Sequence, residues 1–191
     1  MMKEFVNKIV TLDNIKQWEE RDSVIKESVS QHSFKVSAIC VFLLENVKCD
    51  VVEFIDFKLK CVEYSILHDF DESILGRDIS HVVKYNEFNG SDIREILSEF
   101  VEHSLQKLGL KFLFESFDDN DVKTFVKLCD WIGLYTFITR NENMGVKAFE
   151  LEKEYCLKNI EIKKVESENI LKNRFGINFF NFESLVQNLI N

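Results

Sequence analysis

The chain has 191 residues, of which 46% are hydrophobic and 18 are phenylalanine, so it is long and apolar enough to form a globular core. Its formal net charge is −9 and no block of lysine and arginine occurs, which argues against long nucleic acid as a partner but not against a single nucleotide. No apolar run approaches the roughly 20 residues that span a bilayer, so no membrane partner is expected.

The five cysteines are scattered and include no Cys-x-x-Cys pair, which disfavours a zinc–thiolate site. Their odd number is typical of reduced core thiols. Since the first residues also lack the apolar core of a signal peptide, the sequence predicts a cytoplasmic protein.

Proline is absent and only six glycines occur, so long helices joined by short turns are expected. The composition and apolar spacing predict an all-α fold in one domain over residues 1–191, with C-terminal helices from 144–191 packing on it. In chain order, helices are expected over residues 3–20, from about Ser28 to Val47, over the stretch before His68, over 91–108 with Ser91 as N-cap, after Asp121, over 144–164, and as a short helix within 175–190.

The stretch from Phe54 to Glu72 contains the first candidate site. Its apolar residues, including Ile55, Leu59 and Ile66, suit a buried helix that ends in the pair His68-Asp69. Imidazole and carboxylate commonly hold divalent metals where water must stay reactive. If the helix continues, Glu72 lies on the same face as the pair. A His-Asp pair at a helix end can also be no more than a hydrogen-bonded pair. Whether it binds a metal therefore depends on whether the rest of the chain supplies further ligands.

Two further residues stand on apolar helix faces. His32 opens the stripe formed by Val36, Ile39 and Leu43, although a histidine in such a place is more often a core or cap residue than a ligand. Asp130 is the only charged residue between Leu128 and Ile138. Because a buried unpaired carboxylate is costly, Asp130 needs a metal or a buried arginine or lysine as its partner.

Taken together, His32, His68, Asp69 and Asp130 resemble the His…His-Asp…Asp signature of the HD superfamily of metal-dependent phosphohydrolases. This resemblance implies a helical bundle with a central metal site. The implied ion is one divalent metal such as Mn²⁺, Co²⁺ or Mg²⁺, with Fe, Ni or Zn as alternatives.

Over about residues 10–150 the chain is similar to the bacterial 5′-deoxynucleotidase branch of that superfamily, whose members remove phosphate from deoxynucleoside monophosphates. The similarity includes Gln17-Trp18 before His32, the sequence His68-Asp69-x-x-Glu72, and then Gly76-Arg77-Asp78 and Val83-Lys84. It implies that Glu72 is the catalytic acid beside the water and leaving group, with Asp69 as a ligand that shares in catalysis.

The same resemblance implies that Trp18 lines the substrate pocket and that Asp78 touches the sugar, with Gln17, Arg77 and Lys84 as further substrate contacts. Two departures stand out: the family has arginine where this chain has Gln17, and Arg77 is an extra residue before Asp78. The candidates to supply the missing positive charge are Lys16, Arg21, Arg77 and Lys84.

The sequence therefore predicts a metal-dependent phosphohydrolase that releases phosphate from deoxynucleoside 5′-monophosphates by attack of a metal-bound water. A nucleoside triphosphate hydrolase on the same scaffold is the first alternative. A non-catalytic HD module that binds a nucleotide or a partner, an interaction protein that uses its phenylalanine-rich tail, and a homodimer also remain open.

Overall fold

The computed structural model describes residues 2–19, 21–78, 90–111, 118–177 and 181–190, and it confirms the predicted all-α fold. One isolated antiparallel bridge joins Lys16 to Ser28. The helices follow one another in this order: α1 (Met2–Asn14), α2 (Val29–Glu45), α3 (Val52–Leu67), α4 (Phe70–Leu75), α6 (Gly90–Leu108), α8 (Asn120–Asn143), α9 (Glu150–Phe175) and α10 (Phe182–Ile190).

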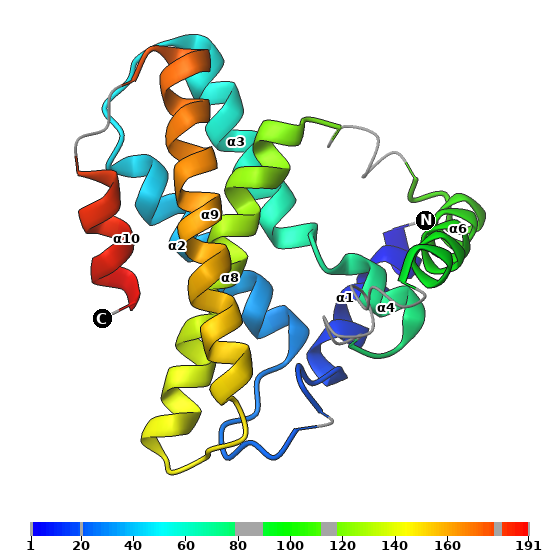
Figure 1. Ribbon diagram of the computed structural model, residues 1–191. Helices are drawn as coiled ribbons and strands as arrows, with labels where there is room; N and C mark the ends of the chain where they lie inside the picture. The colour runs from blue at the N-terminus through cyan, green and yellow to red at the C-terminus, as the bar shows by residue number, and fades with distance from the viewer. Residues whose placement is uncertain (1, 20, 79–89, 112–117, 178–180, 191) are drawn as a thin grey trace.

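The main core lies between α2, α3, α8, α9 and α10, which form the larger body in Figure 1. Helix α8 lies in its middle and buries apolar residues along most of its length. The largest fully buried side chains of this core are aromatic: Phe54, Phe57, Phe125, Phe137, Phe149 and Phe182.

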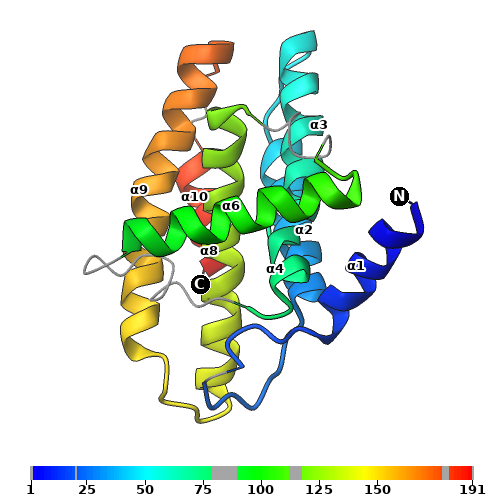
Figure 2. The same ribbon diagram turned by 90° about the vertical axis from the view of Figure 1, so that its right-hand side faces the viewer.

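A second, smaller core joins α1, α4 and α6 to the start of α2. Figure 1 shows these three helices grouped on one side of the bundle, and Figure 2 shows that α6 runs across the direction of the long helices. Phe70 of α4 stacks on Phe5 of α1 with ring centroids 5.6 Å apart. The other buried members are Leu12, Ile15, Val29, Leu105 and Leu110.

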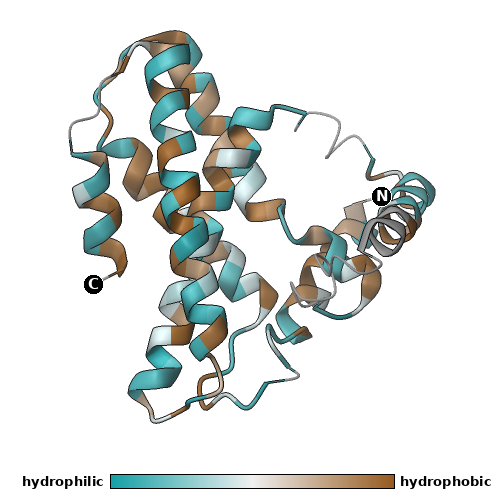
Figure 3. Ribbon diagram, viewed as in Figure 1, coloured by the Kyte–Doolittle hydropathy of each residue, from teal (hydrophilic) through white to brown (hydrophobic). Residues whose placement is uncertain are grey.

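The C-terminal segment belongs to the main core. Helix α10 carries both hydrophobic and hydrophilic residues (Figure 3), and its Phe182 and Val186 are fully buried. Phe182 packs beside Phe125 of α8 with centroids 6.2 Å apart. The expected short terminal helix is therefore present and docked, which leaves the alternative of a partner-binding phenylalanine tail with little support. In the described residues, no helix has the length and apolar character needed to span a membrane.

The predicted helix over 3–20 is too long, because α1 ends at Asn14. Beyond it Lys16 forms an isolated bridge with Ser28, and the Gln17 N–H donates to the carbonyl of Glu27 at 2.9 Å. Trp18 then has a φ of +56°, a left-handed conformation that a right-handed helix cannot contain. These contacts turn the chain back to the start of α2.

Other boundaries also differ. The helix expected over 144–164 begins at Glu150 and runs to Phe175, where Gly176 ends it with a φ of +68°. Helix α6 begins at Gly90, before the expected N-cap Ser91. The helix before His68 is only half buried, since Ile55, Leu59 and Ile66 are exposed. Apolar residues on all sides of α3 made it resemble a fully buried helix, but α3 lies at the edge of the bundle.

Candidate metal centre

His32 lies in the first turns of α2, and a capping box fixes the start of that helix. The Ser28 side chain accepts from the Gln31 N–H, and the Gln31 side chain accepts from the Ser28 N–H. Such a reciprocal cap defines where a helix begins and how its first turn is oriented. As a result, the His32 ring points into the interior and is only 1% exposed.

His68 and Asp69 lie at a break between two helices. The sequence suggested one continuous helix, but α3 ends at Leu67 and α4 begins at Phe70. The prediction that His68, Asp69 and Glu72 lie on one face of a continuous helix is therefore wrong. The break still turns Glu72 inward, where it is 2% exposed.

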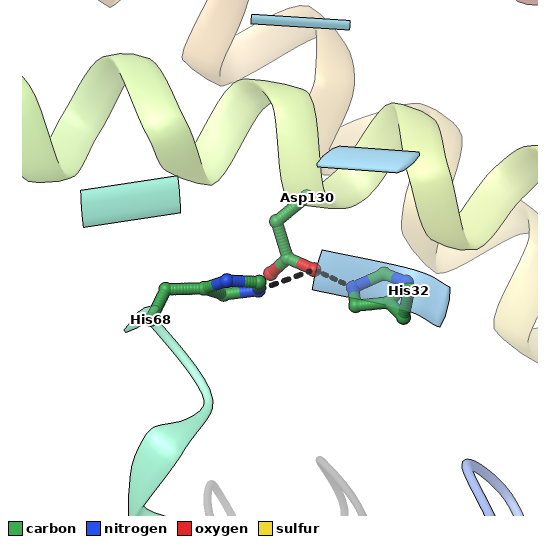
Figure 4. A group of neighbouring side chains, drawn as sticks. All are labelled: His32, His68 and Asp130. Carbon is green, nitrogen blue, oxygen red and sulfur yellow. Dashed lines mark hydrogen bonds and ion pairs between the residues drawn. The ribbon is translucent and has the colours of Figure 1, made fainter. Parts of the chain in front are cut away.

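Asp130 is buried in the middle of α8, and both histidines face it (Figure 4). His32 Nε2 lies 2.8 Å from Asp130 Oδ1, and His68 Nε2 lies 3.8 Å from the same oxygen. One potential ligand atom from each residue falls within 4.8 Å of the other two. Three helices thus bring two imidazoles and a carboxylate to one point.

The orientation of His68 suits metal binding. Its Nδ1 lies 2.8 Å from the carbonyl oxygen of Ser65, which can only accept, so Nδ1 carries the proton. Nε2 then faces Asp130, and it can bind a metal when it gives up its own proton. A backbone carbonyl that fixes the tautomer in this way is a common partner of a metal-binding histidine.

Asp69 lies at the edge of this cluster. Its Oδ2 is 3.1 Å from His68 Nε2, so it faces the same nitrogen as Asp130. The structure brings three of the four ligands predicted from sequence together directly: His32, His68 and Asp130. The fourth, Asp69, lies beside this group through its contact with His68. This mixed set of nitrogen and oxygen donors, without thiolate, fits a divalent ion such as Mn²⁺, Co²⁺, Mg²⁺ or Fe²⁺.

The electrostatics of the cluster also favour a cation. Burial lowers the pKa of His68, but the carboxylates of Asp69 and Asp130 outweigh it and hold that pKa well above its usual value. Burial raises the pKa of Asp130, yet Lys127 and the two histidines bring it well below the ordinary range. Two carboxylates facing two imidazoles therefore attract positive charge, which a divalent ion would supply.

Lys127 is a member of the site that the sequence did not single out. Its Nζ donates to Asp130 Oδ2 at 2.6 Å and lies 5.1 Å from the centre of the Trp131 ring. At Oδ2, Asp130 thus has a lysine, one of the two partners considered from sequence. Its Oδ1 faces the histidines, where the metal considered as the other partner would bind. An acid–base spacing of i, i+3 in an apolar helix is the signal that could have found it.

A pocket of about 640 Å³ opens beside the cluster, a size typical of small-molecule sites. Four of the residues for which the family resemblance implies a role line it: Gln17, Trp18, Glu72 and Asp78. Tyr64 lines it as well, and burial raises its pKa to about 12, so the phenol keeps its proton.

Asp78 and Trp18 are joined within this pocket. Asp78 Oδ2 accepts from the backbone N–H of Trp18 at 2.7 Å, which ties the segment after α1 to the end of α4. Gln17 is buried, and its Oε1 has no hydrogen-bond partner in the described part of the chain. The pocket thus offers a polar amide beside an indole.

Of the cations proposed to replace the family's arginine, the three that the structure describes, Lys16, Arg21 and Arg77, do not line the pocket. Arg21 pairs with Glu152, and Arg77 is exposed and does not line the pocket. Lys84 lies outside the described residues. The positive charge that does line the pocket comes from α8 and α9, through Lys123, Lys127 and Lys163.

Comparison with known proteins agrees with this geometry. A family model described as "5′-deoxynucleotidase YfbR-like" matches residues 4–176. Among solved structures, the crystal structure of an HD-domain phosphohydrolase (lin2634) from Listeria innocua is similar with a TM-score of 0.65 and 16% sequence identity, covering 98% of this chain and 97% of that chain. No curated protein sequence matches.

The fold is that of an HD-domain phosphohydrolase, and in this chain it brings together a histidine–aspartate cluster that could hold a metal ion. Since the family model covers most of the chain, the assignment can be narrower. The chain belongs to the YfbR-like 5′-deoxynucleotidase family.

Proposed function

We propose that this protein hydrolyses a phosphate bond of a nucleotide, with deoxynucleoside 5′-monophosphates as the first substrates to test. The observation that carries the proposal is the convergence of His32, His68 and Asp130 within 4.8 Å at the wall of a pocket. Membership of a family described by its 5′-deoxynucleotidase activity supports the choice of substrate.

In this proposal His32, His68, Asp69 and Asp130 hold one divalent ion. When bound, such an ion lowers the pKa of water and polarises a phosphoryl oxygen. The protein contributes by fixing the donors: Ser65 orients His68, and Lys127 holds Oδ2 of Asp130 so that Oδ1 faces the histidines.

Glu72 is proposed as the catalytic acid. It is buried, lines the pocket, and lies in α4 directly after the His68-Asp69 break. From there a carboxyl group can hold the attacking water or give a proton to the leaving oxygen. Trp18 and Asp78 are proposed to contact the nucleoside, since both line the pocket and their positions are fixed relative to each other.

The test is a screen of ribo- and deoxynucleoside mono-, di- and triphosphates with Mn²⁺, Co²⁺ and Mg²⁺, following products by chromatography. Glu72→Gln should retain metal, measured by elemental analysis, and lose at least about 100-fold in kcat. Glu63→Gln, at an exposed position of α3, serves as the matched control. Absence of turnover on every nucleotide would refute the proposal, and a near-normal rate for Glu72→Gln would remove Glu72 from the mechanism.

A further inference from the structure

The side chains around the metal cluster give the pocket an excess of negative charge. Among the described residues, five carboxylates line it against three lysines: Asp69, Asp71, Glu72, Asp78 and Asp130. A divalent ion held by Asp69 and Asp130 would have its two positive charges balanced by the two carboxylates. The phosphate of a nucleoside monophosphate carries up to two negative charges, so it needs a cation of the protein beside it.

The described residues between α1 and α2 place no cation in the lining of the pocket. Gln17 stands where the family that the chain resembles has arginine, and its side chain is 6% exposed. An amide can donate a hydrogen bond to phosphate but brings no charge, and hydrogen bonds between neutral groups are roughly half as strong as charged ones. Among the described residues, the charge can therefore come only from the lysines of α8 and α9.

Lys127 is the pocket lysine that is bonded to the cluster. Its Nζ donates to Asp130 Oδ2 at 2.6 Å, while Oδ1 of the same carboxylate lies 2.8 Å from His32 Nε2. Figure 4 shows that the two histidines approach Asp130 together. An anion that reaches the point where these side chains meet is therefore close to the Lys127 ammonium.

The other two lysines of the pocket are paired closer to the surface. Lys123 lies 3.4 Å from Asp118, whose side chain is 95% exposed, and Lys163 lies 2.6 Å from Glu166, which is 44% exposed. Neither forms an ion pair with the cluster in the described part of the chain. Their position favours Lys127 as the lysine that meets a single phosphate there.

Trp131 holds the Lys127 ammonium at the pocket wall without neutralising it. Nζ lies 5.1 Å from the centre of the Trp131 ring, and this ring packs edge-on against Tyr155 of α9 with centroids 5.4 Å apart. The Lys127 side chain is 33% exposed and lines the pocket, so a ligand can reach it. A cation held in place in advance loses less conformational entropy when it binds an anion.

The bond between Lys127 and Asp130 is compatible with a second role for the lysine. In the metal-free protein the Asp130 carboxylate is met by Lys127 and His32. Once the charge of Asp130 is shared with a metal ion, its attraction for the ammonium is weaker. Lys127 can then donate to a phosphate oxygen from nearly the same position.

We propose that Lys127 binds the phosphate of the nucleoside monophosphate, in the role that the family's arginine has at the position of Gln17. The inference rests on the proposed function and adds to it the protein's own cation for the substrate. In this role the Nζ of Lys127 donates to a phosphate oxygen and stabilises the negative charge of the phosphoryl group.

The first test measures phosphate binding without turnover. Inorganic phosphate is titrated by calorimetry into the Mg²⁺-saturated protein, Lys127→Gln, Lys127→Arg and Lys158→Gln, which changes an exposed lysine outside the pocket lining. Lys127→Gln should bind phosphate at least about tenfold more weakly, because a charge-assisted hydrogen bond is lost. Lys127→Arg should recover most of the affinity, and Lys158→Gln should match the original protein. Equal affinities of the original protein and Lys127→Gln would overturn the assignment.

Metal affinity distinguishes this role from a purely structural one. Lys127 competes with a metal ion for the charge of Asp130, so Lys127→Gln should bind Mn²⁺ at least as tightly as the original protein. If Lys127 only orients Asp130, the variant should bind Mn²⁺ more weakly and have normal phosphate affinity at saturating metal. That result would refute the proposal.

A labelling experiment tests the same contact without any substitution. The Mg²⁺-saturated protein is treated briefly with an amine-acetylating reagent, with and without inorganic phosphate, and mass spectrometry follows Lys127 and Lys158. Phosphate should slow the acetylation of Lys127 several-fold and leave Lys158 unchanged. Equal rates at Lys127 with and without phosphate would contradict the contact.

Kinetics with a deoxynucleoside 5′-monophosphate at saturating Mn²⁺ complete the test. The value of kcat/KM should fall at least about tenfold in Lys127→Gln, recover in Lys127→Arg and stay unchanged in Lys158→Gln. Unchanged kcat/KM in Lys127→Gln would overturn the inference and leave the proposed function standing. If no nucleotide is hydrolysed by the original protein, the proposed function fails, and the phosphate titration and the labelling still decide whether Lys127 binds phosphate.

Discussion

His32 Nε2 lies 2.8 Å from Asp130 Oδ1, although 98 residues separate the two in the sequence. The pair joins the first turns of α2 to the middle of α8, and His68 approaches the same oxygen from the end of α3. Because three helices must be docked before these atoms can meet, metal binding and the folded bundle should be thermodynamically linked.

Added metal should therefore raise the melting temperature. At a free Mn²⁺ or Co²⁺ concentration about 100 times the Kd, linkage adds about 2.7 kcal/mol to the free energy of unfolding. For a chain of this size that corresponds to roughly 5–10 °C in calorimetry or fluorescence melting. His32→Ala and Asp130→Asn should lose the shift, whereas Asp56→Asn, at a surface pair of α3, should keep it. A full shift in Asp130→Asn would contradict the proposed ligand set.

Gly133 of α8 lies against the ring of His32. A Cβ at this position would lie 3.3 Å from Cγ2 of Val36 and 3.4 Å from Cε1 of His32. Alanine normally stabilises a helix interior by about 1 kcal/mol over glycine, but here the new methyl group presses on two side chains of α2. The tighter contact is with Val36, which is β-branched and rotates little, so the methyl group strains the packing of α2 against α8 that positions His32.

Gly133→Ala should thus lower metal affinity by about tenfold, with a much smaller effect on unfolding. Metal titration followed by calorimetry measures the first quantity, and urea denaturation the second. Val36→Ala in the Gly133→Ala background makes room for the methyl group. It should recover part of the affinity if the effect is steric, and a failure to do so would point to another cause.

Asn141 fixes the segment that carries Gln17 and Trp18. Its Oδ1 accepts from the N–H of Ile25 at 2.9 Å, and its Nδ2 donates to the carbonyls of Ile25 and Phe137. Since Asn141 is fully buried, its removal leaves backbone groups of Ile25 without a partner.

Asn141→Ala should reduce the free energy of unfolding by about 2 kcal/mol, measured by urea denaturation. Asn169→Ala, on an exposed site of α9, should change it by less than about 0.5 kcal/mol. In hydrogen exchange, the Ile25 amide should lose protection in Asn141→Ala. Unchanged protection there would show that other contacts hold this segment.

Two of the proposed ligands, His32 and Asp130, could be singled out from sequence because each lies on an apolar helix face. His32 and Asp130 stand where a charged or polar side chain is costly unless it has a partner, so their burial alone demanded an explanation. The helical periodicity of α2 and α8 was strong enough to place both residues inside the bundle.

Lys127, Asn141 and the end of α1 could not be predicted in the same way. Lys127 lies on a helix where lysine is ordinary, and its place in the pocket depends on residues of other elements that form the pocket with it. Asn141 bonds Ile25, which lies 116 residues away in the sequence. Helix α1 stops at Asn14, and Lys16 and Gln17 then pair with Ser28 and Glu27 just before α2. Such features arise from contacts between elements, which periodicity does not encode.

The loss of folding free energy at acid pH should depend in part on Asp119, the N-cap of α8. Its carboxylate accepts from the N–H groups of Asp121 and Val122 and from Nη1 of Arg174 at 2.9 Å, which ties the start of α8 to the end of α9. Partial burial raises the pKa of Asp119, but the bond with Arg174 and the backbone bonds outweigh it, so the net pKa is below the usual 3.8.

A carboxyl group with a lowered pKa stabilises the fold above its unfolded pKa, and this contribution is lost as the pH falls through the folded pKa. Asp119→Asn keeps the helix cap but removes the charge, so at pH 7 it should cost about 1 kcal/mol. The cost should shrink as the pH falls below the usual 3.8 and through the lower folded pKa, where the original carboxyl group is also protonated. Urea denaturation of both proteins from pH 7 to about pH 2 measures the difference. A cost that stays constant over this range would show that the charge of Asp119 does not stabilise the junction with Arg174.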